Sequence, residues 1–303
     1  MGFTRLETQN VYKNFDEKEV LKGVNFRVES GKAYGLLRRN GAGKTTVIRI
    51  IMGVFAADRG SVLLDGKPFD RRGVLIGYMP EERGLYQQTE ITEQLVYLAK
   101  LRGLQSAAAK KSVSRWLEKL GMGKYAHRKL ATLSKGNQQK IQLAATLMTE
   151  PDIIILDEPF SGLDPVNAEV LKDAVREMID KGKIVLFSSH QMNYVEEFCD
   201  GVALLHHGVI AVSGGIAEIK RSYERNLVRV STVNIKAMLD FCQAEFSNAE
   251  QNGGDVLITL RGGGDKAGCF AKITASGIDF DHMGVVEPTL NDIFVKHTKE
   301  ELE

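Results

Sequence analysis

The chain has 303 residues, and its 40 Lys and Arg against 39 Asp and Glu leave a formal net charge of +1. A hydrophobic fraction of 43% with 26% charged residues is ordinary for a folded soluble protein, so disorder and a general polyanion-binding surface are both disfavoured. No apolar run approaches the roughly 18 to 20 residues of a membrane span, and the three cysteines form no pair typical of a disulfide framework or a zinc site. We therefore expect a cytoplasmic protein that acts at a membrane only through a partner.

The first part of the chain alternates short apolar runs with polar turns. Strands are expected at residues 24–28, 33–37 and 62–64, with a helix at residues 44–52. From residue 92 to about residue 149 the apolar period is helical, which predicts a helical insert at about residues 85–150. Beyond it strands and helices alternate, which indicates a largely parallel sheet covered by helices. Its strands are expected at residues 153–156, 184–188 and 202–205, and its helices at 166–180 and 193–198.

The pattern changes again after about residue 220. The order of strands and helices there resembles a small split-βαβ, ferredoxin-like unit, followed by one last helix. The strands are expected at residues 227–230, 256–260 and 278–286, and the helices at 235–243, 266–275 and 289–297. We therefore predict two domains, one at residues 1–220 and a small α+β accessory domain at residues 221–303.

A strand, a loop and a helix follow one another around residue 40, which is the context of a nucleotide-binding loop. The loop lets backbone N–H groups approach phosphate oxygens, and the helix start adds about half a positive charge. Lys44 can reach terminal phosphates, and Thr45 can ligate Mg²⁺. The residues expected to hold phosphate are Asn40, Gly41, Ala42, Gly43, Lys44, Thr45 and Thr46. The alternative for the loop alone is a glycine-containing turn before an ordinary helix.

Arg38 occupies the position where the strict nucleotide-binding pattern has its first glycine, and Arg39 follows it. If residue 38 needs a positive φ, its side chain costs roughly 1 to 2 kcal/mol. If it does not, the two guanidinium groups add positive charge near phosphate. The sequence leaves both alternatives open.

The buried strand at residues 153–156 runs directly into Asp157 and Glu158, at the edge of the sheet where ligands of open α/β folds bind. Asp157 is expected to hold Mg²⁺, and Glu158 to polarise a water that attacks the γ-phosphate. The alternative is an acidic cap of the next helix. His190 follows the strand at residues 184–188 and should emerge at the same edge, although a histidine after a strand is more often an ordinary loop residue.

Ser134 and Gly136 precede a further helical run, at residues 140–148. A hydroxyl, a backbone N–H and a helix start together predict a second phosphate cradle. On physical grounds alone, an ordinary serine N-cap is favoured.

Five motifs occur in an order that resembles the ATP-binding subunit of an ABC transporter, over about residues 6–220. They are residues 40–46, 133–137, 153–159 and 161–164, and His190. The resemblance implies a P-loop NTPase of the ABC type, an α/β fold with an antiparallel β subdomain and a helical insert. It also implies that Asn137 belongs to the signature motif, Asp164 to the D-loop, and that Phe15 stacks on adenine, with a core position as the alternative for Phe15.

The resemblance further implies how such a chain works. Two ATP-binding subunits, here expected as a homodimer, sandwich ATP with Mg²⁺ head to tail, so that the signature of one copy serves the site of the other. The helical insert would dock on an integral-membrane permease subunit at the inner face of the cell membrane. Residues 81–92 are expected near that surface, with Glu90, Ile91 and Thr92 as contacts or, alternatively, as a solvated loop. Nucleic acid is not expected as a partner.

Three departures from the family pattern stand out. Arg38 and Arg39 replace the usual Gly-Pro, Lys135 and Asn137 alter the signature, and Glu81 stands where Gln is typical. Glu81 keeps an oxygen for Mg²⁺ or ATP contact, but it brings negative charge near phosphate. Residues 80–86 and 287–294 resemble bacterial exporters of the sodium or drug efflux type that carry an extra C-terminal domain.

The sequence thus predicts an ATPase whose hydrolysis is coupled to transport, with Glu158, His190 and Lys44 as its catalytic residues. Two alternatives remain: a nonmembrane ABC protein, which would normally carry two cassettes or a long coiled coil, and a nucleotide-binding regulatory module with weak hydrolysis. The second alternative is motivated by Arg38 and Glu81.

Overall fold

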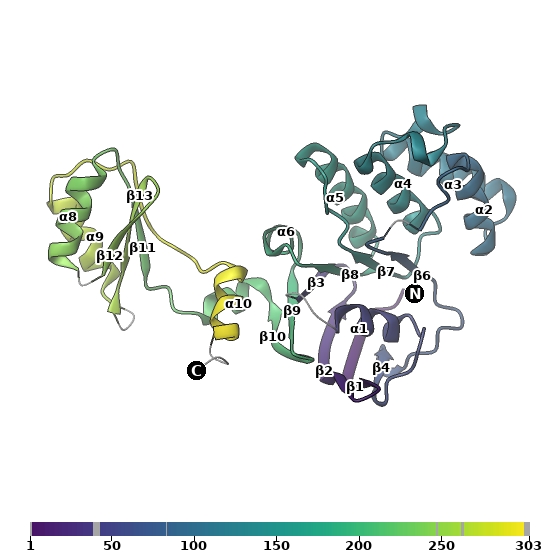
Figure 1. Cartoon of the computed structure of the whole chain (residues 1–303), viewed down its shortest axis with the longest axis horizontal. Helices are drawn as coiled ribbons and strands as arrows, with labels where there is room; N and C mark the ends of the chain where they lie inside the picture. The colour runs from purple at the N-terminus through teal and green to yellow at the C-terminus, as the bar shows by residue number, and fades with distance from the viewer. Residues whose placement is uncertain (1, 39–42, 83, 247, 262–263, 300–303) are drawn as a thin grey trace. The chain divides into compact units, whose positions relative to one another are not determined.

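The computed structural model describes residues 2–38, 43–82, 84–246, 248–261 and 264–299 (Figure 1). The chain divides into two compact units, residues 1–216 and residues 217–303. Within the part of the chain that the structure describes, no helix combines the length and the apolar character that crossing a membrane requires.

The first unit begins with an antiparallel sheet in the order β2-β1-β4-β5. Its strands are β1 (Arg5–Phe15), β2 (Lys18–Glu29), β4 (Arg59–Leu64) and β5 (Lys67–Pro68). Alternate residues Val24, Phe26 and Val28 of β2 are buried, as expected for a strand with one face in a core. The helix α1 (Lys44–Ile51; Figure 1) shares that core, because its apolar side chains belong to the same cluster as residues of this sheet and of the next one.

The second sheet of this unit has the order β10-β9-β3-β8-β7-β6, in which the pairs from β9 to β6 are parallel and β10 pairs antiparallel. Its strands are β3 (Ala33–Arg38), β6 (Ile76–Met79), β7 (Ile153–Asp157), β8 (Ile184–Ser189), β9 (Gly201–His206) and β10 (Val209–Gly215). All residues of β7 and β8 are buried, because helices cover both faces of a parallel sheet. The helices α5 (Pro165–Asp180) and α6 (Met192–Phe198) follow β7 and β8.

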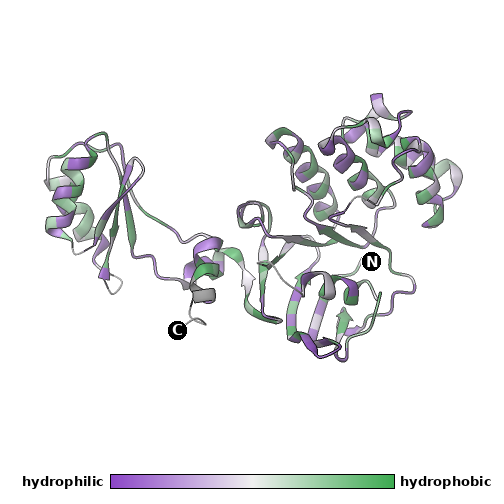
Figure 2. Ribbon diagram, in the orientation of Figure 1, coloured by the Kyte–Doolittle hydropathy of each residue, from purple (hydrophilic) through white to green (hydrophobic). Residues whose placement is uncertain are grey.

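The predicted helical insert consists of α2 (Ile91–Leu101), α3 (Ser106–Lys119) and α4 (Lys135–Leu147). Figure 2 shows apolar and polar residues interleaved along these helices. The helices α2 and α3 bury one face, whereas α4 is buried on all sides from Gln138 to Leu147. Trp116 of α3 is fully buried. Ile91, the first residue of α2, is also fully buried, so its expected role as a partner contact is wrong.

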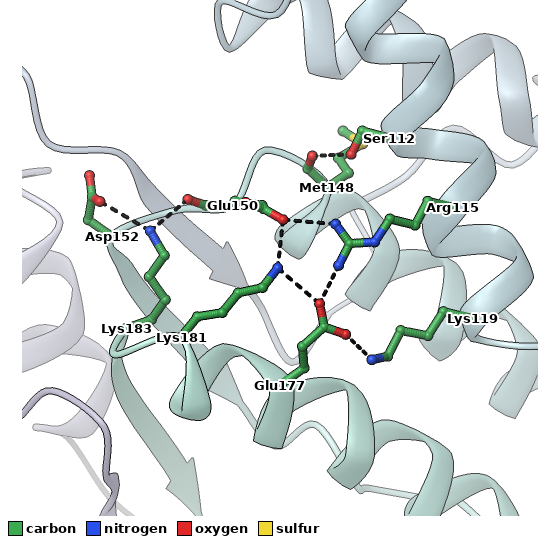
Figure 3. Close-up of polar contacts among 9 residues, drawn as sticks. All are labelled: Ser112, Arg115, Lys119, Met148, Glu150, Asp152, Glu177, Lys181 and Lys183. Atoms are coloured by element: carbon green, nitrogen blue, oxygen red, sulfur yellow. Dashed lines mark hydrogen bonds and ion pairs between the residues drawn. The ribbon is translucent and has the colours of Figure 1, made fainter. Parts of the chain in front are cut away.

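Charged side chains join the insert to the core of the first unit (Figure 3). Glu177 of α5 accepts hydrogen bonds from Arg115 and Lys119 of α3. Arg115 Nη1 also lies 2.9 Å from Glu150 Oε1, and Lys181 Nζ lies 2.8 Å from Glu150 Oε1 and 3.0 Å from Glu177 Oε1. Two carboxylates and three cations thus form one network between α3 and α5.

The second unit contains a four-stranded antiparallel sheet in the order β12-β13-β11-β14, with helices after its first and third strands along the chain. Its elements are α7 (Ile216–Ser222), β11 (Leu227–Ser231), α8 (Ile235–Glu245), β12 (Ala249–Asn252), β13 (Asp255–Thr259), α9 (Lys266–Ala275), β14 (His282–Val285) and α10 (Leu290–Lys299). This is the ferredoxin-like order, as predicted. The core contains Val228, Val230, Val256 and Ile258 of the sheet.

Several elements depart from the sequence prediction; β1, β5, β6 and α7 have no counterpart among the predicted ranges. β12 was not predicted, because its residues Ala249–Asn252 are mostly polar and form an edge strand. β14 is shorter than expected: Ile278 and Phe280 pack against the core ahead of the strand. β10, at the edge of the larger sheet, was also not predicted.

All three cysteines of the chain, Cys199, Cys242 and Cys269, are buried and form no disulfide. Burial raises the pKa of the Cys199 and Cys269 thiols, and it raises the pKa of Cys242 to about 11. These side chains pack as small apolar residues.

Candidate functional site

Three neighbouring parallel strands, β3, β8 and β7, end side by side in the larger sheet. Asp157 is the last residue of β7, and Glu158 follows it; Ser189 ends β8, and His190 follows it. Lys44 opens the helix α1 that follows β3. Because the carboxyl ends of parallel strands share one edge, these side chains meet although up to 146 residues separate them, from Lys44 to His190.

Lys44 is buried between the two carboxylates. Its Nζ lies 3.1 Å from Asp157 Oδ1 and 2.9 Å from Glu158 Oε1. The N-cap of the helix it opens, Gly43, has no side chain, and no other side chain of the described residues caps this helix, so the N–H groups of its first turn can bind an anion. Gly43 precedes it with a φ of 138°, and a Cβ there would lie 2.9 Å from Leu205 Cδ2, so this position needs glycine.

Glu158 is buried and receives hydrogen bonds on both carboxylate oxygens. Its Oε1 accepts from the His190 backbone N at 2.7 Å and faces His190 Nδ1 at 2.8 Å, and its Oε2 accepts from Ser189 Oγ at 2.9 Å. Burial alone would raise the pKa of Glu158, but the Lys44 ammonium and these hydrogen bonds hold it below its usual range. Its backbone has a φ of 50°, a strained conformation for a residue with a side chain, of the kind that clusters at functional sites.

The oxygen atoms of this edge fit a divalent cation. Asp157 is buried, pairs with Lys44 and accepts a hydrogen bond from Ser188. Thr45 is half-buried next to Lys44 in the first turn of α1. Carboxylate and hydroxyl oxygens are the donors that Mg²⁺ prefers, so this set of residues fits Mg²⁺ together with phosphate.

Glu81 is exposed and follows β6, the neighbour of β7. A side chain of α4 holds the loop that contains Glu81: Gln142 Nε2 donates hydrogen bonds to the carbonyls of Pro80 at 2.8 Å and Glu82 at 3.3 Å. Burial, with a contribution from the Asp157 carboxylate, raises the pKa of Tyr78 in β6 to about 12.

The signature and D-loop residues form a separate cluster. Ser134 caps α4 by accepting from the Asn137 backbone N at 3.4 Å, as the N-cap alternative expected. A Cβ at Gly136 would lie 3.3 Å from Leu163 Cδ2, so the start of α4 packs closely on the D-loop. Asp164 caps α5 by accepting from the Asn167 backbone N at 3.0 Å. The contacts of these residues thus remain within one patch, apart from the group around Lys44.

The remaining predicted residues lie as follows. Phe15 ends β1, is 43% exposed and packs edge to face on Phe55 with ring centroids 5.5 Å apart. Thr46 is half-buried in α1, and Asn40, Gly41 and Ala42 lie outside the described residues. Arg38 is the last residue of β3 and pairs with Leu205, so its backbone is extended. Of the two alternatives for residue 38, a required positive φ is therefore wrong.

Sequence reasoning missed the hydroxyls that hold the two carboxylates. Ser188 donates to Asp157, and Ser189 donates to Glu158. The sequence contains a signal that could have identified these serines, since both are polar residues at the end of an otherwise apolar, buried strand. Gln139 was also missed; its Nε2 donates to the Pro159 carbonyl at 3.1 Å and so joins α4 to the residue after Glu158.

Known proteins match this chain over most of its length. The family described as ABC transporter matches residues 21–161, and the C-terminal domain of DrrA1-3-like ATP-binding proteins matches residues 214–298. The ABC transporter ATP-binding protein YhaQ of Bacillus subtilis (strain 168) is 38% identical over 96% of this chain and 97% of its own length. Nod factor export ATP-binding protein I of Burkholderia pseudomallei (strain K96243) is 32% identical over 69% of this chain and 70% of its own.

A third relative and a solved structure are also ATP-binding proteins of this kind. The linearmycin resistance ATP-binding protein LnrL of Bacillus subtilis (strain 168) is 33% identical over 69% of this chain and 68% of its own length. A solved ATP-binding subunit of an ABC transporter has a TM-score of 0.66 and 30% identity, over 72% of this chain and 93% of that chain. The predicted fold, a P-loop ATPase of the ABC type with an additional C-terminal domain, is confirmed. The chain belongs to the ATP-binding proteins of ABC transporters, a family of ATPases coupled to transport.

Proposed function

We propose that this chain hydrolyses ATP between two copies of itself and thereby drives a separate integral-membrane permease, with Glu158 as the base that activates the attacking water. One observation carries the proposal: a buried, ionised carboxylate is held on both oxygens at the sheet edge, beside the ammonium of Lys44. The contacts to Ser189 and His190 fix the orientation of this carboxylate before ATP binds.

The other residues of the edge would then act on the phosphates of ATP. Lys44 and the open start of α1 bind phosphate oxygens, and in doing so Lys44 exchanges its carboxylate partners for phosphate. That exchange releases Glu158 Oε1 from the ammonium and leaves it to a water. Asp157, Thr45 and Glu81 would hold Mg²⁺, which screens phosphate charge when bound. His190 has a side chain 55% exposed, so the part of its ring away from Glu158 remains open to the γ-phosphate.

The separate cluster of Ser134, Gly136, Asn137 and Asp164 supports the head-to-tail pair. Ser134 and Asp164 are exposed and lie at the starts of two adjacent helices, α4 and α5. In the proposed homodimer this surface of one copy covers the ATP that the other copy holds, with Phe15 against the adenine. The signature therefore serves a site that its own chain does not complete.

A groove on the helical insert supports the permease as partner. It has a volume of about 500 Å³ and is lined by Tyr86, Thr89, Glu93, Gln94, Val96, Tyr97 and Lys100. Tyr86 and Tyr97 are 66% and 57% exposed, and large exposed aromatic side chains favour a protein contact. Gln94 fixes the groove by hydrogen bonds of 3.2 Å to both the backbone N and the carbonyl of Tyr86. We propose that a segment of the permease on the inner face of the cell membrane occupies this groove.

Export is the proposed direction, because relatives include a Nod factor export protein and a linearmycin resistance protein. The small unit is proposed as an accessory domain at residues 221–303. Steady-state phosphate release tests the hydrolysis that underlies the proposal: release that collapses in Glu158→Gln supports it. A wild-type chain that binds ATP without releasing phosphate would instead indicate a regulatory module.

A further inference from the structure

Lys172, a buried lysine outside the proposed site, joins α5 and α6, the helices that follow β7 and β8. Lys172 lies on α5, and its side chain is only 3% exposed. Its Nζ lies 2.8 Å from Glu169 Oε1, on the same helix, and 2.6 Å from Glu197 Oε1, on α6. Burial lowers the pKa of Lys172, but the hydrogen bonds to the two glutamates outweigh it and hold the pKa above its usual range, so the cation persists.

The same ammonium faces an aromatic cluster. Lys172 Nζ lies 6.0 Å from the centroid of the Phe160 ring and 5.6 Å from that of Tyr194. Phe160 also packs against Tyr194 and Phe198 of α6, with ring centroids 5.3 and 5.9 Å away. Because Phe160 is two residues after Glu158, this cluster connects the chain around the proposed base with α6.

These contacts help to hold the helix α6 in place. It has seven residues, Met192–Phe198, and a helix this short has little stability of its own. Only one residue, Gln191, separates it from His190. Glu197, Tyr194 and Phe198 all lie on α6, so Lys172 and Phe160 tie this helix to α5 and to the chain after Glu158, in addition to its packing on β8 through Phe198 and Phe187.

We propose that Lys172 is a positioning residue for ATP hydrolysis: by holding Glu197 and Tyr194 it fixes α6 against α5, and so keeps His190 within hydrogen-bond distance of Glu158. The inference rests on the role proposed for His190. Lys172 touches neither ATP nor the attacking water, and it acts on the rate through the geometry of His190 and Glu158.

The two glutamates provide a matched pair of variants. Both pair with Lys172, and their side chains are 54% and 55% exposed, but only Glu197 reaches α6. In the full-length chain we expect Glu197→Gln to lower kcat for phosphate release about tenfold with little change in KM for ATP, because a displacement of about 1 Å can cost up to about 100-fold in rate. Glu169→Gln should keep kcat within about twofold of wild type. Equal effects of the two variants would show that Lys172 contributes only charge neutralisation, and would overturn the proposal.

Lys172 itself is tested through His190. Lys172→Met keeps the length of the side chain and removes its charge; we expect a lower kcat, with partial recovery in Lys172→Arg. In a His190→Ala background Lys172→Met should have no further effect on kcat, since its route to the reaction is already lost. The same fold reduction in both backgrounds would overturn the proposal. If Lys172→Met does not fold, the glutamate pair decides alone, because both side chains are half exposed.

The failure of this inference can be separated from that of the proposed function. Full turnover by His190→Ala would overturn the role proposed for His190, and this inference with it. Reduced turnover by His190→Ala, together with equal effects of the two glutamate variants, would overturn this inference alone.

Discussion

At the scale of single residues, the proposed function makes turnover of ATP depend on one carboxylate, that of Glu158. Glu158→Gln keeps the size of the side chain and an acceptor for Ser189, but removes the proposed base. We expect phosphate release to fall about 10²- to 10⁴-fold, the usual contribution of general base catalysis, while calorimetry shows that ATP with Mg²⁺ still binds. Asp173 is an exposed carboxylate on α5, and Asp173→Asn serves as the control. It should change neither phosphate release nor ATP binding. Hydrolysis at the wild-type rate by Glu158→Gln would refute the assignment.

The same residues show what a sequence can predict about a site. Asp157, Glu158 and His190 were predicted together, because strand ends of a parallel sheet meet at one edge. The roles of Ser188 and Ser189 were not predicted. An apolar strand that ends in two serines does not indicate to which carboxylate each hydroxyl donates its hydrogen bond. The burial of Ile91 also escaped prediction, since it depends on the packing of α2 against the rest of the insert.

At the scale of helices, the charged network between α3 and α5 offers a test of how the insert is held. Glu177→Gln weakens contacts to Arg115, Lys119 and Lys181, so the free energy of unfolding should fall by about 1 kcal/mol, near the upper end for surface ion pairs. The loss should shrink in about 1 M salt, where the screening length is about 3 Å. Denaturation followed by tryptophan fluorescence reports on this region, because Trp116 of α3 is the only tryptophan of the chain.

The control for the network lies in the second unit. Glu245 pairs with Lys272 at 2.9 Å, and Glu245→Gln should leave the Trp116 transition unchanged. A loss in Glu177→Gln that persists undiminished in high salt would mean that packing, and not ion pairing, fastens α3.

A second prediction at this scale concerns the groove that residues of α2 line. Tyr97→Ala removes an aromatic side chain from the groove. Tyrosine is enriched among interface hot spots, which each contribute at least about 2 kcal/mol, so co-purification with the permease should be lost. ATP hydrolysis by the separate subunit should not change. Leu101→Ala is the matched control, because Leu101 is 65% exposed at the end of the same helix but does not line the groove. Permease binding that survives Tyr97→Ala would place the docking surface elsewhere.

At the scale of the whole molecule, two units with separate cores should unfold separately. Scanning calorimetry of Glu158→Gln is expected to show two transitions, of which ATP with Mg²⁺ raises only that of residues 1–216. At about 100 times its dissociation constant a ligand adds about 2.7 kcal/mol to the folded state that binds it. A single transition that ATP with Mg²⁺ raises as a whole would show that the units unfold as one.

The fold itself was largely predictable, for reasons that differ between the units. In the first unit, apolar strands buried on both faces, such as β7 and β8, leave a strong signal. In the second unit the order of elements indicated a ferredoxin-like sheet, although β12 was missed, because an edge strand needs no apolar residues. The ion pairs and aromatic contacts that join α3, α5 and α6 are tertiary contacts between residues far apart in the sequence, and no periodicity in the sequence predicts them.

The burial of Cys199, Cys242 and Cys269 makes this chain convenient for spectroscopy. Their raised pKa values keep the thiols protonated, and protonated, inaccessible thiols react slowly with maleimides. The native sequence can therefore serve as the background for one added cysteine at an exposed position, such as Tyr97 in the groove or Glu81 beside β6. A nitroxide or a dye attached there would report the approach of two copies, or of a permease, without prior removal of the native thiols.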